Sequence, residues 1–215
     1  MGNYENGAFT RQAIVKACKK LFYEKGYQET SYGDICKEAH VNRSTIYYHF
    51  RDKDEMRYEV MWEYTVDFKH IAEKYCGRPE YDYIVAVYLL WRQAKKDEKF
   101  RRFVYGLCVD YPVYTGKKDI SQYYGVLSDH MWGHFIDQKQ ISQLAKASVY
   151  GYIMCCMRML CENPDHYDVM EIFQHCVNSS ISIWVGPQDQ VEGFWEEVQA
   201  CIARIPEEVV TVGDQ

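Results

Sequence analysis

The stretch Val41–Lys53, VNRSTIYYHFRDK, decides how the first part of this chain folds. Asn42 is a favourable helix N-cap, and Ile46 and Phe50 lie four residues apart, so one face of a short helix is apolar and can be buried. The other faces carry side chains that can all donate hydrogen bonds, and none of them is acidic: Arg43, Ser44, Thr45, Tyr47, Tyr48 and His49. Such a surface predicts contact with a polyanion.

Another short helix is predicted immediately before this stretch, over residues 31–39. Ser31 and Asp34 have the spacing of a capping box, and Ile35 and Ala39 form an apolar stripe. Two short helices joined by residues 40–42 are the pattern of a helix-turn-helix.

A longer helix is expected upstream, from Thr10 to Lys25, after a frayed arm over residues 1–8. Gly26 is suited to end this helix, because glycine readily adopts the left-handed backbone of a C-terminal cap. The three helices are predicted to pack around one small core, which consists of Ile14, Leu21, Phe22, Ile35, Val41, Ile46 and Phe50.

Three segments of this region resemble the DNA-binding domain of the TetR (tetracycline repressor) family: the run from Thr10 through Gly26 and Tyr27, the segment DICKEAHV, and the segment STIYYHFRDKDEM. They match in order and without a gap over the first quarter of the chain. The resemblance implies a homodimeric bacterial transcription regulator, by default a repressor, that binds a palindromic operator in double-stranded DNA and is released by a small molecule. Two residues depart from the family pattern. Gly33 stands where many members have a long, often basic residue, and His40 occupies a turn position that is usually glycine.

Residues for DNA contact follow from the helix geometry and from the matched family positions. Arg43 lies at the N-terminal end of the second short helix, and its planar fork matches guanine O6 and N7. We predict base contacts from Arg43, Ser44 and Tyr47. Phosphate contacts are predicted from Thr30, Ser31, Thr45, Tyr48, His49 and Lys53. The alternative for the tyrosines is that Tyr47 or Tyr48 packs against the first helix.

Composition limits the remaining possibilities. The chain has 215 residues and a net charge of −6, but residues 1–60 carry ten Lys and Arg against nine Asp and Glu, so the acidic excess lies in the remainder. No run of about 18 apolar residues predicts a membrane span, and no signal peptide opens the chain, so we expect a cytoplasmic protein. Nine cysteines without a CxxC pair are therefore expected to be reduced thiols.

The predicted fold is all-α, with a DNA-binding domain over residues 1–51 and a larger helical ligand-binding and dimerisation domain over residues 52–215. A long helix over residues 52–75, capped by Asp52, links the two. Further helices are predicted over 81–96, 98–111, 119–136, 138–161, 165–185 and 189–204, because proline residues fall near their ends and no alternating strand pattern competes.

The two late helices, predicted over 138–161 and 165–185, are candidates for a homodimer interface, because both are apolar around more of their circumference than one buried face requires. The residues expected at this interface are Ala147, Tyr150, Gly151, Met154, Phe173, Ser180 and Trp184. The alternative is that both helices belong to the core of one chain.

Aromatic residues make up 16% of the chain and suggest a cavity for an aromatic or hydrophobic small molecule. The residues predicted to line it are Trp91, Phe103, Cys108, Tyr111, Tyr123, Trp132, Met154 and Arg158. Arg158 would meet an anionic ligand, and Asp110 would meet a cationic one. The alternatives are that the aromatic residues are ordinary core and that Arg158 reaches solvent or a neighbouring charge.

No cofactor, metal or enzymatic activity is predicted. His130 and His134 have i, i+4 spacing on one helix but no definite third ligand, and no nucleophile elbow, phosphate-binding glycine loop or paired-carboxylate signature is present. Two other functions stay open: a helical adaptor that binds proteins through its late helices, and a helical enzyme that uses the aromatic cavity.

Overall fold

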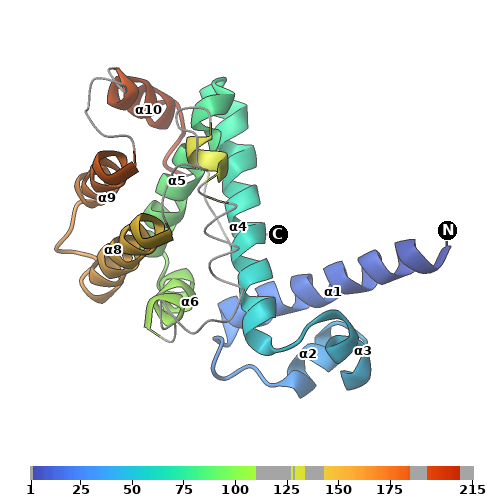
Figure 1. The fold of residues 1–215 in the computed structure, drawn as a ribbon. Coiled ribbons are helices and arrows are strands. Elements are labelled where there is room, and N and C mark those ends of the chain that lie inside the picture. The colour runs from blue at the N-terminus through green and yellow to red at the C-terminus, as the bar shows by residue number, and fades with distance from the viewer. Residues whose placement is uncertain (1, 110–126, 128, 134–142, 185–192, 209–215) are drawn as a thin grey trace. The chain divides into compact units, whose positions relative to one another are not determined.

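A computed structural model describes residues 2–109, 127, 129–133, 143–184 and 193–208 (Figure 1). Its helices are α1 (Gly2–Glu24), α2 (Tyr32–Glu38), α3 (Arg43–His49), α4 (Lys53–Cys76), the 3-10 turn η1 (Pro79–Tyr81), α5 (Asp82–Lys96), α6 (Glu98–Val109), α8 (Gln143–Glu162), α9 (Val169–Trp184) and α10 (Phe194–Ala203). No strand occurs among these residues. The predicted all-α fold, with an N-terminal helix-turn-helix and a larger helical part, is confirmed.

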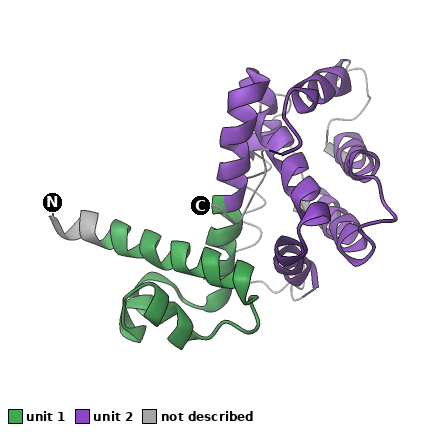
Figure 2. Ribbon diagram, turned by 180° about the vertical axis from the view of Figure 1, so that it is seen from behind, with its two compact units in different colours: residues 1–63 green, residues 64–215 purple. Residues whose placement is uncertain are grey.

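The chain divides into two compact units, Met1–Glu63 and Tyr64–Gln215 (Figure 2). The division falls inside α4, so this helix contributes residues to both units. We placed the domain boundary before this helix, at residues 51 and 52.

The core of the first unit is formed by α1, α2, α3 and the start of α4, with α1 packed on α2 and α2 on α3. Its most deeply buried side chains are Ile14, Val15, Cys18, Phe22, Ile35, Ile46, Phe50, Met56 and Val60. Most of the predicted core is included, although Leu21 and Val41 are only half-buried. Burial among these side chains raises the pKa of the Cys18 thiol to about 12.

The first helix is longer than predicted, since α1 begins at Gly2 and leaves no frayed arm over residues 2–8. Its end agrees with the prediction. The backbone NH groups of Lys25 and Gly26 both donate to the Leu21 carbonyl, at 2.8 and 3.2 Å, and Gly26 has φ 99°. A glycine is needed here because other residues are disfavoured at positive φ.

Side chains cap the next three helices as their sequence predicts. Ser31 and Asp34 form a complete capping box on α2, and the Asn42 side chain accepts from the Thr45 NH on α3. Asp52 accepts from the Glu55 NH on α4, at 2.8 Å. These caps satisfy backbone donors that a helix leaves unpaired at its start.

The turn between α2 and α3 passes through a left-handed residue. His40 has φ 54°, and it is the positive-φ residue other than glycine among those described. Glycine is absent from the very position at which the left-handed backbone is required, so the turn carries a local conformational cost.

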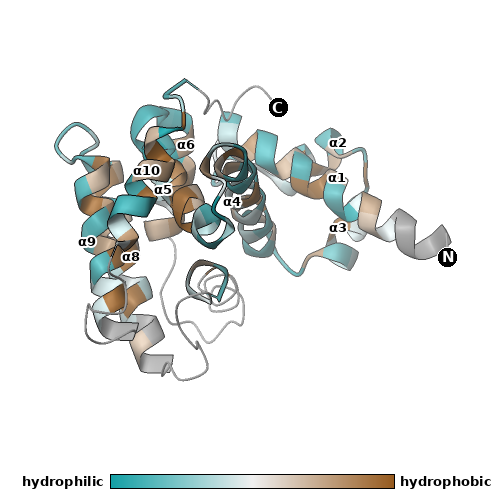
Figure 3. Cartoon of the chain, turned by 90° about the horizontal axis from the view of Figure 1, so that it is seen from above, coloured by the Kyte–Doolittle hydropathy of each residue, from teal (hydrophilic) through white to brown (hydrophobic). Residues whose placement is uncertain are grey.

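The second unit is built around α5, which packs against α6, α8, α9 and α10. Helices α5, α8 and α9 carry stretches of hydrophobic residues (Figure 3). Aromatic rings fill two regions of this core. Tyr64 contacts Phe100 and Phe103, with ring centroids 5.0 and 5.7 Å away, and Phe173 contacts Trp91 at 5.7 Å.

One disulfide crosses the second unit and corrects the expectation that all cysteines are reduced. Cys76, at the end of α4, is bonded to Cys201 on α10, with a Cα–Cα distance of 4.6 Å. The Arg204 guanidinium also donates to the Cys76 carbonyl at 2.9 Å. The spacing of the cysteines could not reveal this pair, because its members are 125 residues apart.

Within the described ranges, no helix is both long and apolar enough to cross a lipid bilayer.

Candidate nucleic-acid interface

The buried face of α3 determines which of its side chains point outward. Ile46 and Phe50 are almost completely buried in the first unit, at 0% and 1% exposure. Because they anchor one side of this short helix, the remaining sides face solvent. Tyr47 and Tyr48 are 49% and 84% exposed, and Arg43 is exposed as well.

Arg43 is held by aromatic side chains rather than by an acid. Its Nε and Nη2 donate to the Tyr47 hydroxyl oxygen, at 3.1 and 2.9 Å, and its Cζ lies 5.1 Å from the centroid of the Tyr32 ring. Its positive charge is therefore not neutralised by a carboxylate of the described residues. The sequence did not point to Tyr32, because no local rule places the first residue of α2 beside α3.

The hydroxyl groups of Ser44 and Thr45 both turn toward the helix cap. They donate to Asn42 Oδ1, at 2.6 and 2.9 Å. In this arrangement their lone pairs remain available to accept a hydrogen bond, whereas a phosphate requires a donor. Ser44 is exposed, and its base contact stays a prediction, while Thr45 would have to turn its hydroxyl to reach a phosphate.

Tyr48 and His49 lie side by side at the end of α3, with ring centroids 5.0 Å apart in an edge-on arrangement. The Tyr48 hydroxyl can reach outward because the ring is so exposed. His49 is half-buried. Their contacts with phosphates stay a prediction.

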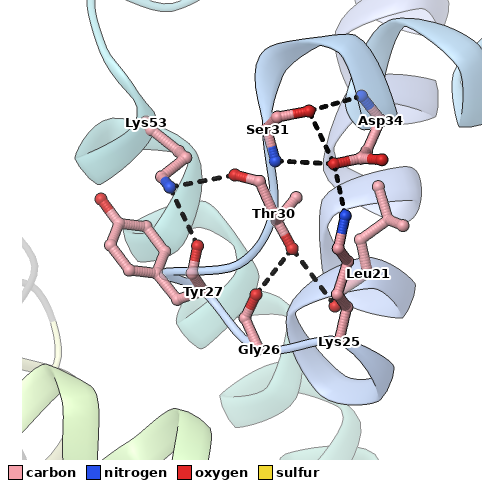
Figure 4. Close-up of polar contacts among 8 residues, drawn as sticks. All are labelled: Leu21, Lys25, Gly26, Tyr27, Thr30, Ser31, Asp34 and Lys53. Atoms are coloured by element: carbon pink, nitrogen blue, oxygen red, sulfur yellow. Dashed lines mark hydrogen bonds and ion pairs between the residues drawn. The ribbon is translucent and has the colours of Figure 1, made fainter.

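Lys53 does not point away from the domain as we expected. Its Nζ donates to the carbonyls of Tyr27 and Thr30, at 2.9 and 3.0 Å, and lies 4.3 Å from the centroid of the Tyr27 ring (Figure 4). Burial lowers the pKa of this ammonium group, and the nearby Arg57 adds to the effect. The structure thus gives Lys53 a role inside the domain, which removes it from our set of phosphate donors.

Thr30 and Ser31 also differ from the prediction, since their backbone NH groups already have partners. Thr30 is 1% exposed, its hydroxyl donates to the Gly26 carbonyl at 2.7 Å, and its NH donates to the Tyr27 carbonyl. The NH and the hydroxyl of Ser31 both donate to Asp34 Oδ2. The cap that starts α2 therefore uses the donors that we assigned to a phosphate.

Asp34 is held as an anion at this cap. The ammonium of Lys25 lies 2.7 Å from its Oδ2, and this contact, followed by the hydrogen bonds from Ser31, keeps the pKa of Asp34 well below its usual range. Other basic residues of the first unit are paired with acids in the same way, including Arg11 with Glu59 and Lys20 with Glu38. The face of α3 thus differs from its surroundings, because it has hydrogen-bond donors and no acid.

The residues predicted to line one cavity belong to separate parts of the second unit. Trp91, Phe103 and Trp132 are buried, at 3% exposure or less. Trp91 contacts Phe173, whereas Trp132 stacks on Phe194 with centroids 5.9 Å apart. These contacts support the core alternative for the three aromatic residues.

The other predicted pocket residues are less enclosed. Cys108 and Met154 are half-buried, and burial raises the pKa of the Cys108 thiol. Arg158 is exposed and forms an ion pair with Glu162 at 2.8 Å, so it does not point an uncompensated charge into the core. Tyr111 and Tyr123 lie outside the described residues, as does Asp110.

The histidine pair gives no metal centre in the described part of the chain. His130 stacks on the Tyr83 ring, with centroids 4.5 Å apart, and His134 lies outside the described residues. No group of three or more possible metal ligands occurs among the residues that can be searched.

Two of the residues predicted for the dimer interface lie in the core of the second unit. Phe173 is 1% exposed and contacts Trp91, and Ser180 is 3% exposed and donates to the Cys176 carbonyl. Tyr150 is 9% exposed, while Gly151 and Met154 are half-buried. The side chains of Ala147 and Trp184 lie outside the described part.

Each of the two late helices nevertheless has an exposed stripe. Four exposed residues of α8 recur at intervals of four, three and four positions, and the exposed residues of α9 do the same, while Arg158 and Glu162 are further exposed residues of α8. These intervals place them on one face of each helix. The stripe of α8 is Ser148, Tyr152, Cys155 and Met159, and the stripe of α9 is Glu171, His175, Asn178 and Ser182.

Helices α2 and α3 are both capped at their starts, and the turn between them passes through a left-handed residue. Helix α3 exposes a face of hydrogen-bond donors. Together these features define a helix-turn-helix DNA-binding domain. Comparison with known proteins agrees, because residues 14–60 match the model for bacterial regulatory proteins of the tetR family. The match lies within α1–α4 and includes both helices of the helix-turn-helix, α2 and α3.

Several known proteins are similar to parts of this chain. The HTH-type transcriptional regulator AcrR of Shigella flexneri is 38% identical over 74 residues, which are 34% of this chain and 31% of AcrR. An HTH-type transcriptional regulator of Staphylococcus aureus is 34% identical over 93 residues, 41% of this chain and 49% of that protein. The chain thus matches 31% to 49% of the length of these relatives.

Among solved structures, tylp, a tetR regulator from Streptomyces fradiae, aligns with a TM-score of 0.49 and 17% sequence identity. The alignment covers 93% of this chain and 99% of that one. NalD, the secondary repressor of the MexAB-OprM multidrug efflux pump in Pseudomonas aeruginosa, aligns with a TM-score of 0.42 and 20% identity, over 84% and 98% of the two chains.

Proposed function

We propose that this protein is a homodimeric bacterial transcriptional repressor that binds a palindromic operator through α3 and is released when a small molecule binds to the second unit. The observation that carries the proposal is the exposed face of α3, on which Arg43 and Tyr48 project outward and no acidic side chain occurs. A surface of this kind favours the phosphates and base edges of a major groove. The tetR match over residues 14–60 supports the same function.

The proposed contacts divide into two groups. Arg43, Ser44 and Tyr47 read base edges, because they lie at the start of α3, where a recognition helix enters the major groove. Thr45, Tyr48 and His49 contact phosphates and fix the register of the protein on the duplex. Lys53, Thr30 and Ser31 are not included, since their donors are used within the domain.

A twofold partner follows from this function, since two half-sites one turn apart require two recognition helices about 34–36 Å apart. We propose the exposed stripes of α8 and α9 as the dimer surface. Tyr152 and Met159 are 39% and 36% exposed, which is unusual for large apolar side chains that contact only solvent. This surface replaces the one that included Phe173 and Ser180.

Thiol labelling offers a direct test of the dimer surface, because Cys155 lies in the α8 stripe and is the exposed one among the free cysteines of the described residues. In a dimer, alkylation of Cys155 should be slower than in a Tyr152→Asp variant that has been driven to monomer. Sedimentation measures the oligomeric state of both. A monomer at micromolar concentration, or equal labelling of a dimer and a monomer, would show that another surface is used.

Release by a ligand requires that the ligand bind the DNA-bound and the released conformation with different affinities. A coupling free energy of about 1–3 kcal/mol is typical for such regulators. We propose that α4 transmits this coupling, since this one helix has residues in both units. An aromatic or hydrophobic effector fits the ring-rich composition of the second unit.

A gel shift with the DNA that flanks the gene of this protein tests the central proposal. Wild-type protein should bind one segment, with an affinity that falls steeply as salt rises. Arg43→Ala should weaken binding to that segment by about 1–3 kcal/mol and relax the preference at one base pair in each half-site. Tyr48→Phe should weaken binding to all sequences alike. Absence of any salt-dependent binding would favour the helical adaptor instead.

A further inference from the structure

The guanidinium of Arg43 is enclosed by two tyrosine rings that come from different helices. Tyr47 lies one turn along α3, and its ring centroid is 5.5 Å from Arg43 Cζ. Tyr32 is the first residue of α2, and its ring centroid is 5.1 Å from the same atom. The two rings also contact each other, with centroids 5.4 Å apart. Arg43 is therefore held in one orientation before any DNA is present.

The hydrogen bonds leave the reading edge of the guanidinium unused. Arginine has five N–H donors in a rigid planar fork. Tyr47 accepts one hydrogen from Nε and one from Nη2. Three hydrogens remain, and two of them, one on each terminal nitrogen, are parallel at the far end of the fork. These two have the geometry for bidentate donation to guanine O6 and N7.

Tyr32 is partly buried, which makes it a suitable support. Its ring is half-buried, and burial raises the pKa of its hydroxyl. The ring belongs to the first residue of α2 and packs against the Tyr47 ring, with centroids 5.4 Å apart. A half-buried ring in contact with a second ring can determine the position of a side chain that packs on its face.

We propose that Tyr32, which lies outside the recognition helix, is a positioning residue that sets the base specificity of Arg43 together with Tyr47. The proposal rests on the DNA-binding function proposed above. A free arginine must lose rotamer freedom when it binds a base, and an arginine already ordered between two rings loses less. The gain applies only where the fixed fork meets a matching base, so it appears as selectivity and not as general affinity.

Selection of binding sites from a half-site library measures this selectivity directly. Tyr32→Leu removes the ring and should reduce the preference at the base pair read by Arg43 by about threefold. Tyr32→Phe keeps the ring and should retain most of the preference. Tyr47→Phe removes the acceptor for both Arg43 hydrogens and should also cost about threefold. In the two Tyr32 variants the affinity for random DNA and its salt dependence should stay as in wild type.

A measurement on the free protein keeps the proposal testable if Tyr32→Leu unfolds. The Nε–H proton of Arg43 should exchange more slowly with water in wild type than in Tyr47→Phe, because it is hydrogen-bonded only in wild type.

Three results would overturn the proposal. If Tyr32→Leu folds and keeps the full preference, the ring is only structural. If Tyr47→Phe binds more tightly or more selectively, the Tyr47 hydroxyl withholds Arg43 from DNA. Equal exchange of the Arg43 proton in both proteins would show that the bond is absent in solution. Wild-type protein that binds no DNA at all would instead refute the DNA-binding function itself, and with it this inference.

Discussion

The α2–α3 region and the α8–α9 region both expose a surface to which we assign a function, but the sequence determines the two surfaces differently. In the first region, two short helices are fixed by caps and by a few buried residues, so the position of each exposed residue follows from its neighbours in sequence. In the second, two long helices are apolar over several faces, and only their packing against α5 and α6 shows which face stays exposed. The comparison teaches that short, capped helices can be interpreted locally and long apolar helices cannot.

The largest effect should separate the buried and the exposed faces of the late helices. Phe173→Ala should reduce the free energy of unfolding of the second unit by about 3–5 kcal/mol, because it empties space among tightly packed rings. Met159→Ala, in the exposed stripe of α8, should change it by about 0.5 kcal/mol or less when the chain is dilute enough to be monomeric, and should weaken self-association. Urea unfolding measures both. Similar losses for the two variants would abolish the distinction between the faces.

Removing the disulfide should destabilise the second unit only. Replacing Cys76 and Cys201 by serine should cost the second unit about 2–5 kcal/mol, since a cross-link between such distant residues restricts the unfolded chain. The first unit should be unaffected, as hydrogen exchange of its helices can show. Cys155→Ser is the matched control, because the Cys155 thiol is exposed and forms no disulfide. An unchanged second unit would mean that the bond contributes nothing to stability.

Lys53 should act on the stability of the first unit. Lys53→Met keeps much of the side-chain volume but removes the donor to two carbonyls, so it should destabilise the unit by about 1–3 kcal/mol. The salt dependence of DNA binding should stay the same, because no phosphate contact is lost. A salt slope reduced by about one unit for each half-site, with full stability, would restore the phosphate role predicted from the sequence.

Replacing the left-handed residue between α2 and α3 should have a smaller, stabilising effect. His40→Gly relieves the conformational cost of φ 54° and should stabilise the first unit by about 1 kcal/mol, reduced by the greater freedom that glycine has in the unfolded chain. Thermal unfolding measures the gain. The same change at Lys37, inside α2, should destabilise the unit and serves as the control.

The smallest effect on stability should come from protonation of the Asp34 carboxylate at acidic pH. The pKa of Asp34 is lower in the folded protein than in the unfolded chain, so its contribution to stability is present above the unfolded value of about 3.9 and is lost as the pH falls further. Asp34→Asn should therefore lower the thermal midpoint near neutral pH, and the difference from wild type should narrow as the pH falls below about 4. A constant difference at every pH would show that the charge of Asp34 is unimportant.

The sequence predicted most of the first unit, because its determinants are short-range. Asn42 and Asp52 cap the helices that their spacing indicates, and Ile35, Ile46 and Phe50 are buried as their periodicity predicts. Residue type alone does not show where a flexible side chain points. Lys53 is basic and follows the recognition helix, but two carbonyls inside the domain attract it.

The second unit was predicted only as a set of helices. The ranges of α5, α6 and α9 agree closely with the expected ones, yet the pairing of Cys76 with Cys201 depends on tertiary contacts. The inward orientation of the Phe173 side chain also depends on tertiary contacts, since α9 is apolar on more than one side. Periodicity predicts that a stripe exists on such a helix, but not which stripe faces inward.

The position of the boundary inside α4 has a consequence for how such chains can be altered. A flexible linker tolerates added residues, whereas a continuous helix advances about 1.5 Å and turns about 100° with each residue. One residue inserted near Glu63 would therefore advance and turn the part of α4 that follows it, and only insertions that complete whole turns would restore the phase of that part of the helix. Any exchange of the second unit between similar chains must respect the helical period of α4.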